Sequence, residues 1–117
     1  MSNTVVEQRT LALNIHEVKL LAEALEDMVE NLAENDENAL AQQYRRLSEK
    51  TGKTATEIPM RPYDVGLAMA ALELLGTRYA ANDKDTFWRA CKQLFAKVDA
   101  LRPPVGNRHW KPTGTER

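Results

Sequence analysis

Apolar residues recur at steps of three and four in four separate segments of this chain of 117 residues. That spacing places them on one side of an α-helix, which repeats every ~3.6 residues. The first segment has the clearest pattern, with Ile15, Val18, Leu21, Leu25, Met28 and Leu32. No convincing pair of strands is evident. The sequence therefore predicts an all-α fold, a compact four-helix bundle with three to five helices as the range.

Capping and helix-breaking residues set the expected helix boundaries. Asn14 is a good N-cap, and Glu17 three residues later completes a capping box. Gly52 is expected to end the second helix, and Pro62 suits the first position of the third. Two prolines after residue 102 stop the fourth helix. The predicted helices cover residues 15–34, 37–51, 62–81 and 85–101.

The connections between these helices leave some choices open. Asn35 and Asp36 prefer helix ends to helix interiors, so we predict a break there, although one continuous rod would keep the apolar residues roughly in register. The third helix is apolar around most of its circumference, which is typical of a buried central helix. Its small residues Gly66, Ala70 and Ala71 are expected to allow close approach of neighbouring helices.

Two further segments are expected to be extended. Residues 4–13 contain β-branched residues with some alternation, but a lone strand would have no partner, so we predict an N-terminal arm. Residues 53–62 contain two prolines and are predicted to be a connector. By length the chain is one domain. We assign residues 1–102 to the helical bundle and residues 103–117 to a basic tail.

Charge is distributed unevenly along the chain, although the formal net charge is only −1. Residues 1–40 carry nine acidic and two basic side chains, a net charge of −7, whereas residues 41–63 and residues 102–117 each have a net charge of +3. The overall balance argues against a general nucleic-acid binder. The polarity indicates instead an acidic end and two basic patches.

The acidic end contains a row of carboxylates on the first predicted helix, here called the acidic ridge. Its members, at helical spacing, are Glu23, Glu26, Asp27, Glu30 and Glu34. Like charges four residues apart repel each other. The ridge is either a solvated face that pairs with Arg45 or Arg46, a surface for a basic partner, or a site for a divalent metal ion. We take it as a partner-binding surface.

Basic side chains form the second candidate surface. They are Arg45, Arg46, Lys50, Lys53 and Arg61 before the third helix, and Arg108 and Lys111 beside Trp110 in the tail. Residues 47–58 have the rhythm of a helix-turn-helix with a recognition helix over residues 54–61, although Pro59 and Pro62 oppose that helix. The sequence TGKT at residues 51–54 lacks the earlier glycine of a phosphate-binding loop, because Leu47 occupies that position.

Catalytic and metal-binding patterns are missing from the sequence. Neither His16 nor His109 has a glutamate three residues before it, as a helical di-iron site would need. The acidic segment after the first helix lacks the glycine of a calcium-binding loop. Cys91 lies on the apolar stripe of the fourth helix and is predicted to be an inert packing residue. We therefore expect no enzymatic activity, no cofactor and no bound metal.

The cellular environment is predicted from two simple counts. The single cysteine excludes an internal disulfide and fits a reducing compartment, so we expect the cytoplasm. The longest apolar run covers residues 65–72, far short of the roughly 18 residues that a membrane span needs. We expect no membrane association.

These observations favour a non-enzymatic protein–protein interaction module: a small adaptor, regulator or inhibitor that uses the acidic ridge and the tail. The partner would be another protein with a basic surface. A homodimer is a further option, because Met28, Val29, Tyr44 and Trp88 make more apolar surface than one narrow stripe requires. The alternative is a nucleic-acid-binding regulator using the basic segment and the tail. Trp110 would fold back on the bundle, anchor a partner or stack on a nucleobase.

Overall fold

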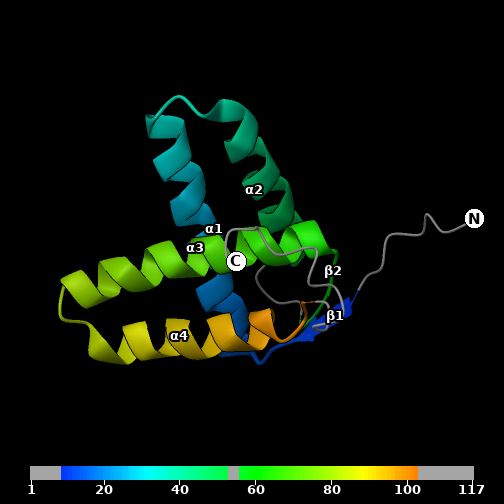
Figure 1. The fold of residues 1–117 in the computed structure, drawn as a ribbon, viewed down its shortest axis with the longest axis vertical. Coiled ribbons are helices and arrows are strands. Elements are labelled where there is room, and N and C mark those ends of the chain that lie inside the picture. Colours follow the sequence, from blue (N-terminus) through cyan, green and yellow to red (C-terminus); the bar gives the residue numbers. More distant parts are fainter. Residues whose placement is uncertain (1–8, 53–55, 103–117) are drawn as a thin grey trace, which may run out of the picture.

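The computed structural model describes residues 9–52 and 56–102, and this part of the chain is mostly helical. The elements are β1 (Arg9–Ala12), α1 (Ile15–Glu34), α2 (Asn38–Thr51), β2 (Glu57–Met60), α3 (Pro62–Ala81) and α4 (Asp85–Asp99). The all-α prediction with four helices is confirmed. Figure 1 shows two helical hairpins, with the α1–α2 hairpin rising at a steep angle from the α3–α4 hairpin. The N-terminal half of α1 passes the α3–α4 hairpin, and its distal half extends beyond it.

The predicted helix boundaries agree with the structure to within one or two residues. At the start of α1 the Asn14 side chain accepts a hydrogen bond from the Glu17 backbone N–H at 2.8 Å, and Glu17 Oε1 accepts one from the Asn14 N–H at 3.0 Å. The chain breaks between α1 and α2, where Asp36 has a φ of 61°. The first two helices are therefore separate, as predicted. Gly52 ends α2 with a φ of 65°, a conformation that favours glycine.

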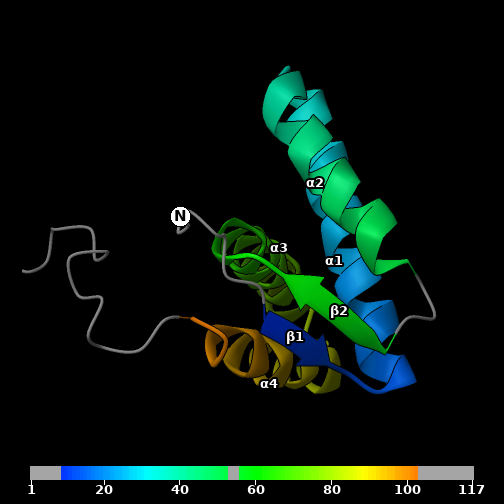
Figure 2. The ribbon, with the colours of Figure 1, turned by 90° about the vertical axis from the view of Figure 1, so that its right-hand side faces the viewer.

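The prediction of an unpaired N-terminal arm and an irregular connector is wrong for residues 9–12 and 57–60. These residues form an antiparallel two-stranded ribbon, in which Leu11 lies opposite Ile58 and Thr10 opposite Pro59. The ribbon lies beside the start of α1, at the end of the α3–α4 hairpin where α3 begins (Figures 1 and 2). Pro59 is tolerated because each strand of a two-stranded ribbon has a free edge, where a missing N–H costs little. Alternating side chains of this ribbon enter the core, since Leu11, Ile58 and Met60 are each only 1% exposed.

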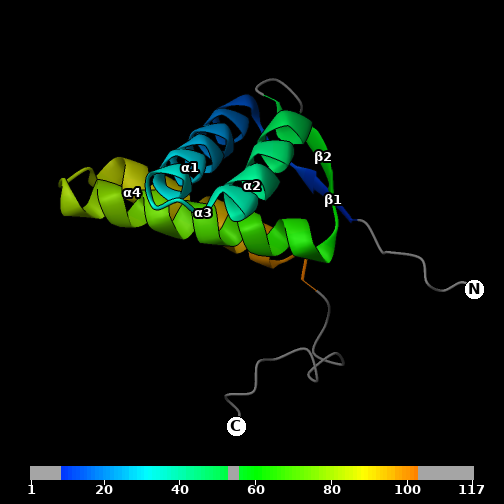
Figure 3. The ribbon, with the colours of Figure 1, turned by 90° about the horizontal axis from the view of Figure 1, so that it is seen from above.

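The hydrophobic core lies where α3 meets α1, α4 and the ribbon. Viewed from above, α1 and α2 lie side by side across α3 (Figure 3). The prediction that α3 is the central helix is confirmed, because α3 packs on both α1 and α4. The expected close approach at Gly66 is wrong, since an added Cβ there would meet nothing within 4 Å. The close approach is at Gly76, where an added Cβ would lie 3.3 Å from Cys91 Cβ.

Candidate functional site

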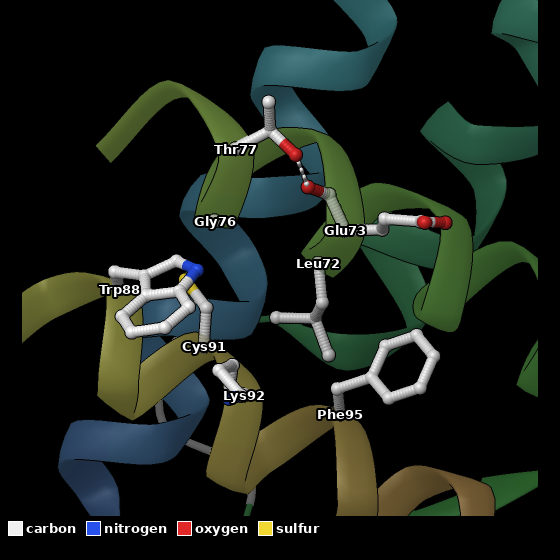
Figure 4. Close-up of a pocket in the computed structure, with 8 residues that line it drawn as sticks. All are labelled: Leu72, Glu73, Gly76, Thr77, Trp88, Cys91, Lys92 and Phe95. Carbon is white, nitrogen blue, oxygen red and sulfur yellow. Dashed lines mark hydrogen bonds between the residues drawn. The ribbon is translucent and has the colours of Figure 1, made fainter. Parts of the chain in front are cut away.

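The outer face of the α3–α4 hairpin carries a pocket of about 280 Å³ (Figure 4). It lies on the side of the hairpin that α1 does not cover. Both helices contribute to its lining, which consists of Leu72, Glu73, Gly76 and Thr77 from α3 and Trp88, Cys91, Lys92 and Phe95 from α4. The pocket is therefore a surface feature of one hairpin.

The close packing at Gly76 shapes this pocket. Because Gly76 has no side chain, α4 approaches α3 there, and the buried side chains of Leu72 and Cys91 lie between the two helices. Trp88 and Phe95 are only partly buried and flank these two residues (Figure 4). The result is an apolar floor with an aromatic ring on either side.

Three polar side chains complete the lining of the pocket, those of Glu73, Thr77 and Lys92. Lys92 Nζ lies 4.5 Å from the centre of the Trp88 ring, a cation–π contact. Thr77 Oγ1 donates a hydrogen bond of 2.8 Å to the Glu73 backbone oxygen, whereas the Glu73 side chain is exposed. Burial, and then the negative charge of Glu23, raises the pKa of the Cys91 thiol to about 11. Cys91 is therefore a neutral thiol at physiological pH and does not supply a thiolate nucleophile.

A second pocket of about 260 Å³ continues along the same face toward the end of α4. It shares Glu73 and Phe95 with the first pocket. Its other lining residues are Pro62, Gly66, Met69, Ala70 and Arg102. We call the two pockets together the α3–α4 groove. Glu73 is the acidic side chain that lines both halves of the groove.

The acidic ridge does not act as one uniform surface. The Tyr79 hydroxyl donates a hydrogen bond to Glu23 Oε2, and Arg78 Nη1 forms a 2.7 Å ion pair with Asp27 Oδ1. Burial, and then the hydrogen bond to Glu23, raises the pKa of Tyr79. Two members of the ridge thus join α1 to α3. Glu30 and Glu34, near the far end of α1, have exposed side chains.

The side-chain partners that the sequence suggested for the acidic ridge differ from those in the structure. The partners of Glu23 and Asp27 come from α3, not from Arg45 or Arg46 on α2. Arg45 donates instead to Gln42 Oε1 at 2.8 Å within α2. Within residues 9–52 and 56–102, no three acidic, histidine or cysteine side chains are grouped so that they could hold a metal ion. In the same ranges no helix is both long enough and apolar enough to cross a membrane.

Three of the basic candidates line one pocket, although strand β2 separates Arg61 from the other two along the chain. Arg46, Lys50 and Arg61 line a pocket of about 140 Å³ together with Tyr63, here called the basic pocket. Its remaining lining residues are Gln43, Leu47, Asp64 and Leu67. Arg45 does not line this pocket. Lys53, Arg108, Trp110 and Lys111 lie outside the described residues.

The helix-turn-helix interpretation is wrong. Its recognition helix would include residues 57–60, but these residues form strand β2 and their backbone pairs with β1. Pro59, the residue that opposed the helix in the sequence, lies within this strand. Arg61 therefore does not belong to a recognition helix over residues 54–61.

Sequence reasoning missed the α3–α4 groove. Trp88 was expected only to add apolar surface for a homodimer, and Phe95 was assigned no role; both are partly buried and flank the groove. The available signal was the position of two aromatic residues beside the stripe rather than on it. No family model, no curated protein and no solved structure matches this chain. Its function is therefore inferred from geometry and chemistry alone.

Proposed function

We propose that this chain is a non-enzymatic helical protein–protein interaction module, an adaptor, regulator or inhibitor that binds a segment of another protein in the α3–α4 groove. The observation that carries the proposal is the apolar floor between Trp88 and Phe95 on a face that no described element covers. Each half of the groove is smaller than the roughly 300–1,000 Å³ of a typical small-molecule pocket. That size suits single anchoring side chains of a protein partner.

The partner segment is defined by the charge and polarity of the groove. Leu72 and the two aromatic rings favour a large apolar anchor such as Leu, Phe or Trp. Glu73 lines both halves and is exposed, so it favours a Lys or Arg next to that anchor. Lys92 is already placed over the Trp88 ring. The expected partner is therefore a protein segment with an apolar side chain beside a basic one.

The acidic ridge has a divided role in this proposal. Glu23 and Asp27 stabilise the contact between α1 and α3. Glu30 and Glu34 are exposed and can steer a basic partner toward the protein over longer distances. The steering contribution should decrease as salt is added, because exposed charges are screened beyond about 8 Å at physiological ionic strength.

Most of the residues that were expected to form a homodimer interface pack inside the protein itself. Tyr44 is buried within the protein, and Met28 and Val29 are partly buried against its own core. Trp88 is the one of the four that lines the groove. Analytical ultracentrifugation of the full chain measures directly whether a second copy occupies the groove, because Phe95→Ala would then shift the dimer–monomer equilibrium.

A selection experiment tests the proposal. Peptides displayed on phage are selected on the immobilised full chain, and the enriched peptides are measured by isothermal titration calorimetry. We expect enrichment of an aromatic or aliphatic residue next to Lys or Arg. Loss of an aromatic anchor at an interface typically costs about 2 kcal/mol or more, so Trp88→Ala and Phe95→Ala should weaken binding by roughly 30-fold.

A matched control is available one residue away from Trp88. Phe87 is 50% exposed and stacks on Tyr79, and it does not line the groove. Phe87→Ala should leave peptide affinity unchanged, and Glu73→Lys should remove the preference for a basic residue. Circular dichroism confirms that each variant is folded. Peptides that bind the Trp88→Ala/Phe95→Ala double variant as well as the original chain would show that the groove is not the docking site.

A further inference from the structure

The basic pocket lies between α2 and the first turns of α3, on residues that the α3–α4 groove does not use. We propose that it binds a nucleotide unit, with the phosphate held by Arg46 and Arg61 and the base stacked on Tyr63. This inference does not depend on the proposed function, because the two sites have no lining residue in common. Of the basic side chains predicted before α3, it uses Arg46 and Arg61, which act at a pocket and not on a recognition helix.

The fold, rather than the local sequence, creates this convergence. Gln43, Arg46, Leu47 and Lys50 follow one another at steps of three, one and three, which places them on one face of α2. Strand β2 then runs back to the start of α3 and brings Arg61 and Tyr63 to the same pocket. The two arginines thus meet from different elements of a packed scaffold.

The charge of the pocket favours an anion. The Asp64 carboxylate is its one acidic group, and Asp64 Oδ2 accepts hydrogen bonds from Lys50 Nζ and from the Arg61 backbone N–H, each at 3.0 Å. Lys50 and Asp64 therefore neutralise each other. Among the described residues, the side chains of Arg46 and Arg61 form no ion pair. Two guanidinium groups remain at one pocket, and such groups bind phosphate through paired hydrogen bonds.

The size of the pocket and the exposure of Tyr63 select the class of anion. A pocket of about 140 Å³ accommodates a single compact group such as phosphate, but not a whole nucleotide. Tyr63 lines the same pocket and is 57% exposed, so most of its side chain is accessible to a ligand. Aromatic side chains beside arginines bind nucleotides by stacking on the base while the arginines contact the phosphate. The shared chemistry is a phosphate next to a planar base, supplied by a single-stranded nucleic acid or by a free nucleotide.

Fluorescence anisotropy with the full chain tests the proposal. The probes are a labelled 12-nucleotide oligothymidylate and a labelled adenosine monophosphate, which distinguish a strand from a free nucleotide. We expect saturable binding of at least one probe at low salt. The Arg46→Ala/Arg61→Ala variant should bind at least 10-fold more weakly, and Tyr63→Ala should also bind more weakly while Tyr63→Phe retains affinity.

The matched control for charge is Arg45→Ala, because Arg45 is the exposed neighbour of Arg46 on α2 and does not line the pocket. This variant should bind within twofold of the original chain. Three results would overturn the proposal: no binding of either probe, an equal loss of affinity in Arg45→Ala and Arg46→Ala, or unchanged affinity in Tyr63→Ala. A phosphotyrosine peptide is tested as a competitor of the bound probe. If it competes more strongly than the unlabelled oligothymidylate and the unlabelled adenosine monophosphate, the pocket binds a phosphorylated protein, and the nucleotide proposal is refuted.

Discussion

Replacement of Ile58 by alanine should weaken the whole helical fold, even though Ile58 belongs to a short strand. Ile58 is 1% exposed, and it lies opposite Leu11 in the ribbon and belongs to the same core as the helices. If the ribbon is part of the core, the helices should unfold at lower denaturant in Ile58→Ala. If the ribbon is an appendage, they should not.

The expected magnitude follows from the lost side-chain carbons and the space they leave. Alanine lacks three carbons of isoleucine, each worth about 0.8 kcal/mol when buried, which gives about 2.4 kcal/mol. The cavity adds to this value, so the free energy of unfolding should fall by about 2.5–4 kcal/mol. A domain of this size is stable by only about 5–15 kcal/mol. The melting temperature should fall by roughly 10–15 °C.

Urea denaturation followed by circular dichroism at a helix-sensitive wavelength measures the effect, because this signal reports the helices rather than the ribbon. The control is Glu57→Ala, since Glu57 is the exposed neighbour of Ile58 in β2 and should change stability by no more than about 0.5 kcal/mol. A loss in Ile58→Ala of less than about 1 kcal/mol, or a loss equal to that of the control, would refute the assignment of the ribbon to the core.

Two further predictions concern backbone conformation and pH. Gly52 has a φ of 65° and a ψ of −158°, so Gly52→Ala should lower the free energy of unfolding by about 1–3 kcal/mol. Gly66 has open space around it in α3, so Gly66→Ala should raise that free energy by up to about 1 kcal/mol. Urea midpoints that shift in the same direction in the two variants would contradict this reasoning. Burial raises the pKa of Glu17, but the hydrogen bond from the Asn14 backbone N–H and the interaction with Lys97 together lower it by more than burial raises it, so the net shift of this pKa is downward. The stability that Glu17 contributes is therefore present at neutral pH and is lost as the pH falls through its folded-state pKa. Urea midpoints measured from neutral to about pH 3 should fall less in Glu17→Gln, and an identical pH profile would refute the linkage.

Helix starts and ends were largely predictable because their signals are local. Asn14 and Glu17 form both bonds of their capping box across three residues, and Gly52 ends α2 as expected. Asp36 lies in the break between α1 and α2, with the positive φ that a short polar residue tolerates better than most. Interactions within one helical turn can be read from adjacent residues, since the chain itself fixes their separation.

The candidate sites were less predictable because they depend on residues from different elements. The basic residues Arg46 and Arg61 were recognised, but their common pocket with Tyr63 requires the ribbon that returns the chain to the start of α3. The acidic ridge was recognised as a row, but Arg78 and Tyr79 were not identified as its partners. Side-chain identity could be read from the sequence, whereas its surroundings could not.

The sequence by itself determined four helices, their approximate boundaries and the faces that they bury, because a helical period and its caps act over three or four residues. Only the tertiary structure decided that β1 pairs with β2 and that the glycine of close approach is Gly76 rather than Gly66. It also decided that Trp88 and Phe95 of α4 flank an open groove together with residues of α3. Each of these outcomes depends on contacts between segments that are distant in the sequence. A local pattern shows which side of a helix or strand is apolar, but only the packing of whole helices and strands decides which other segment that side contacts.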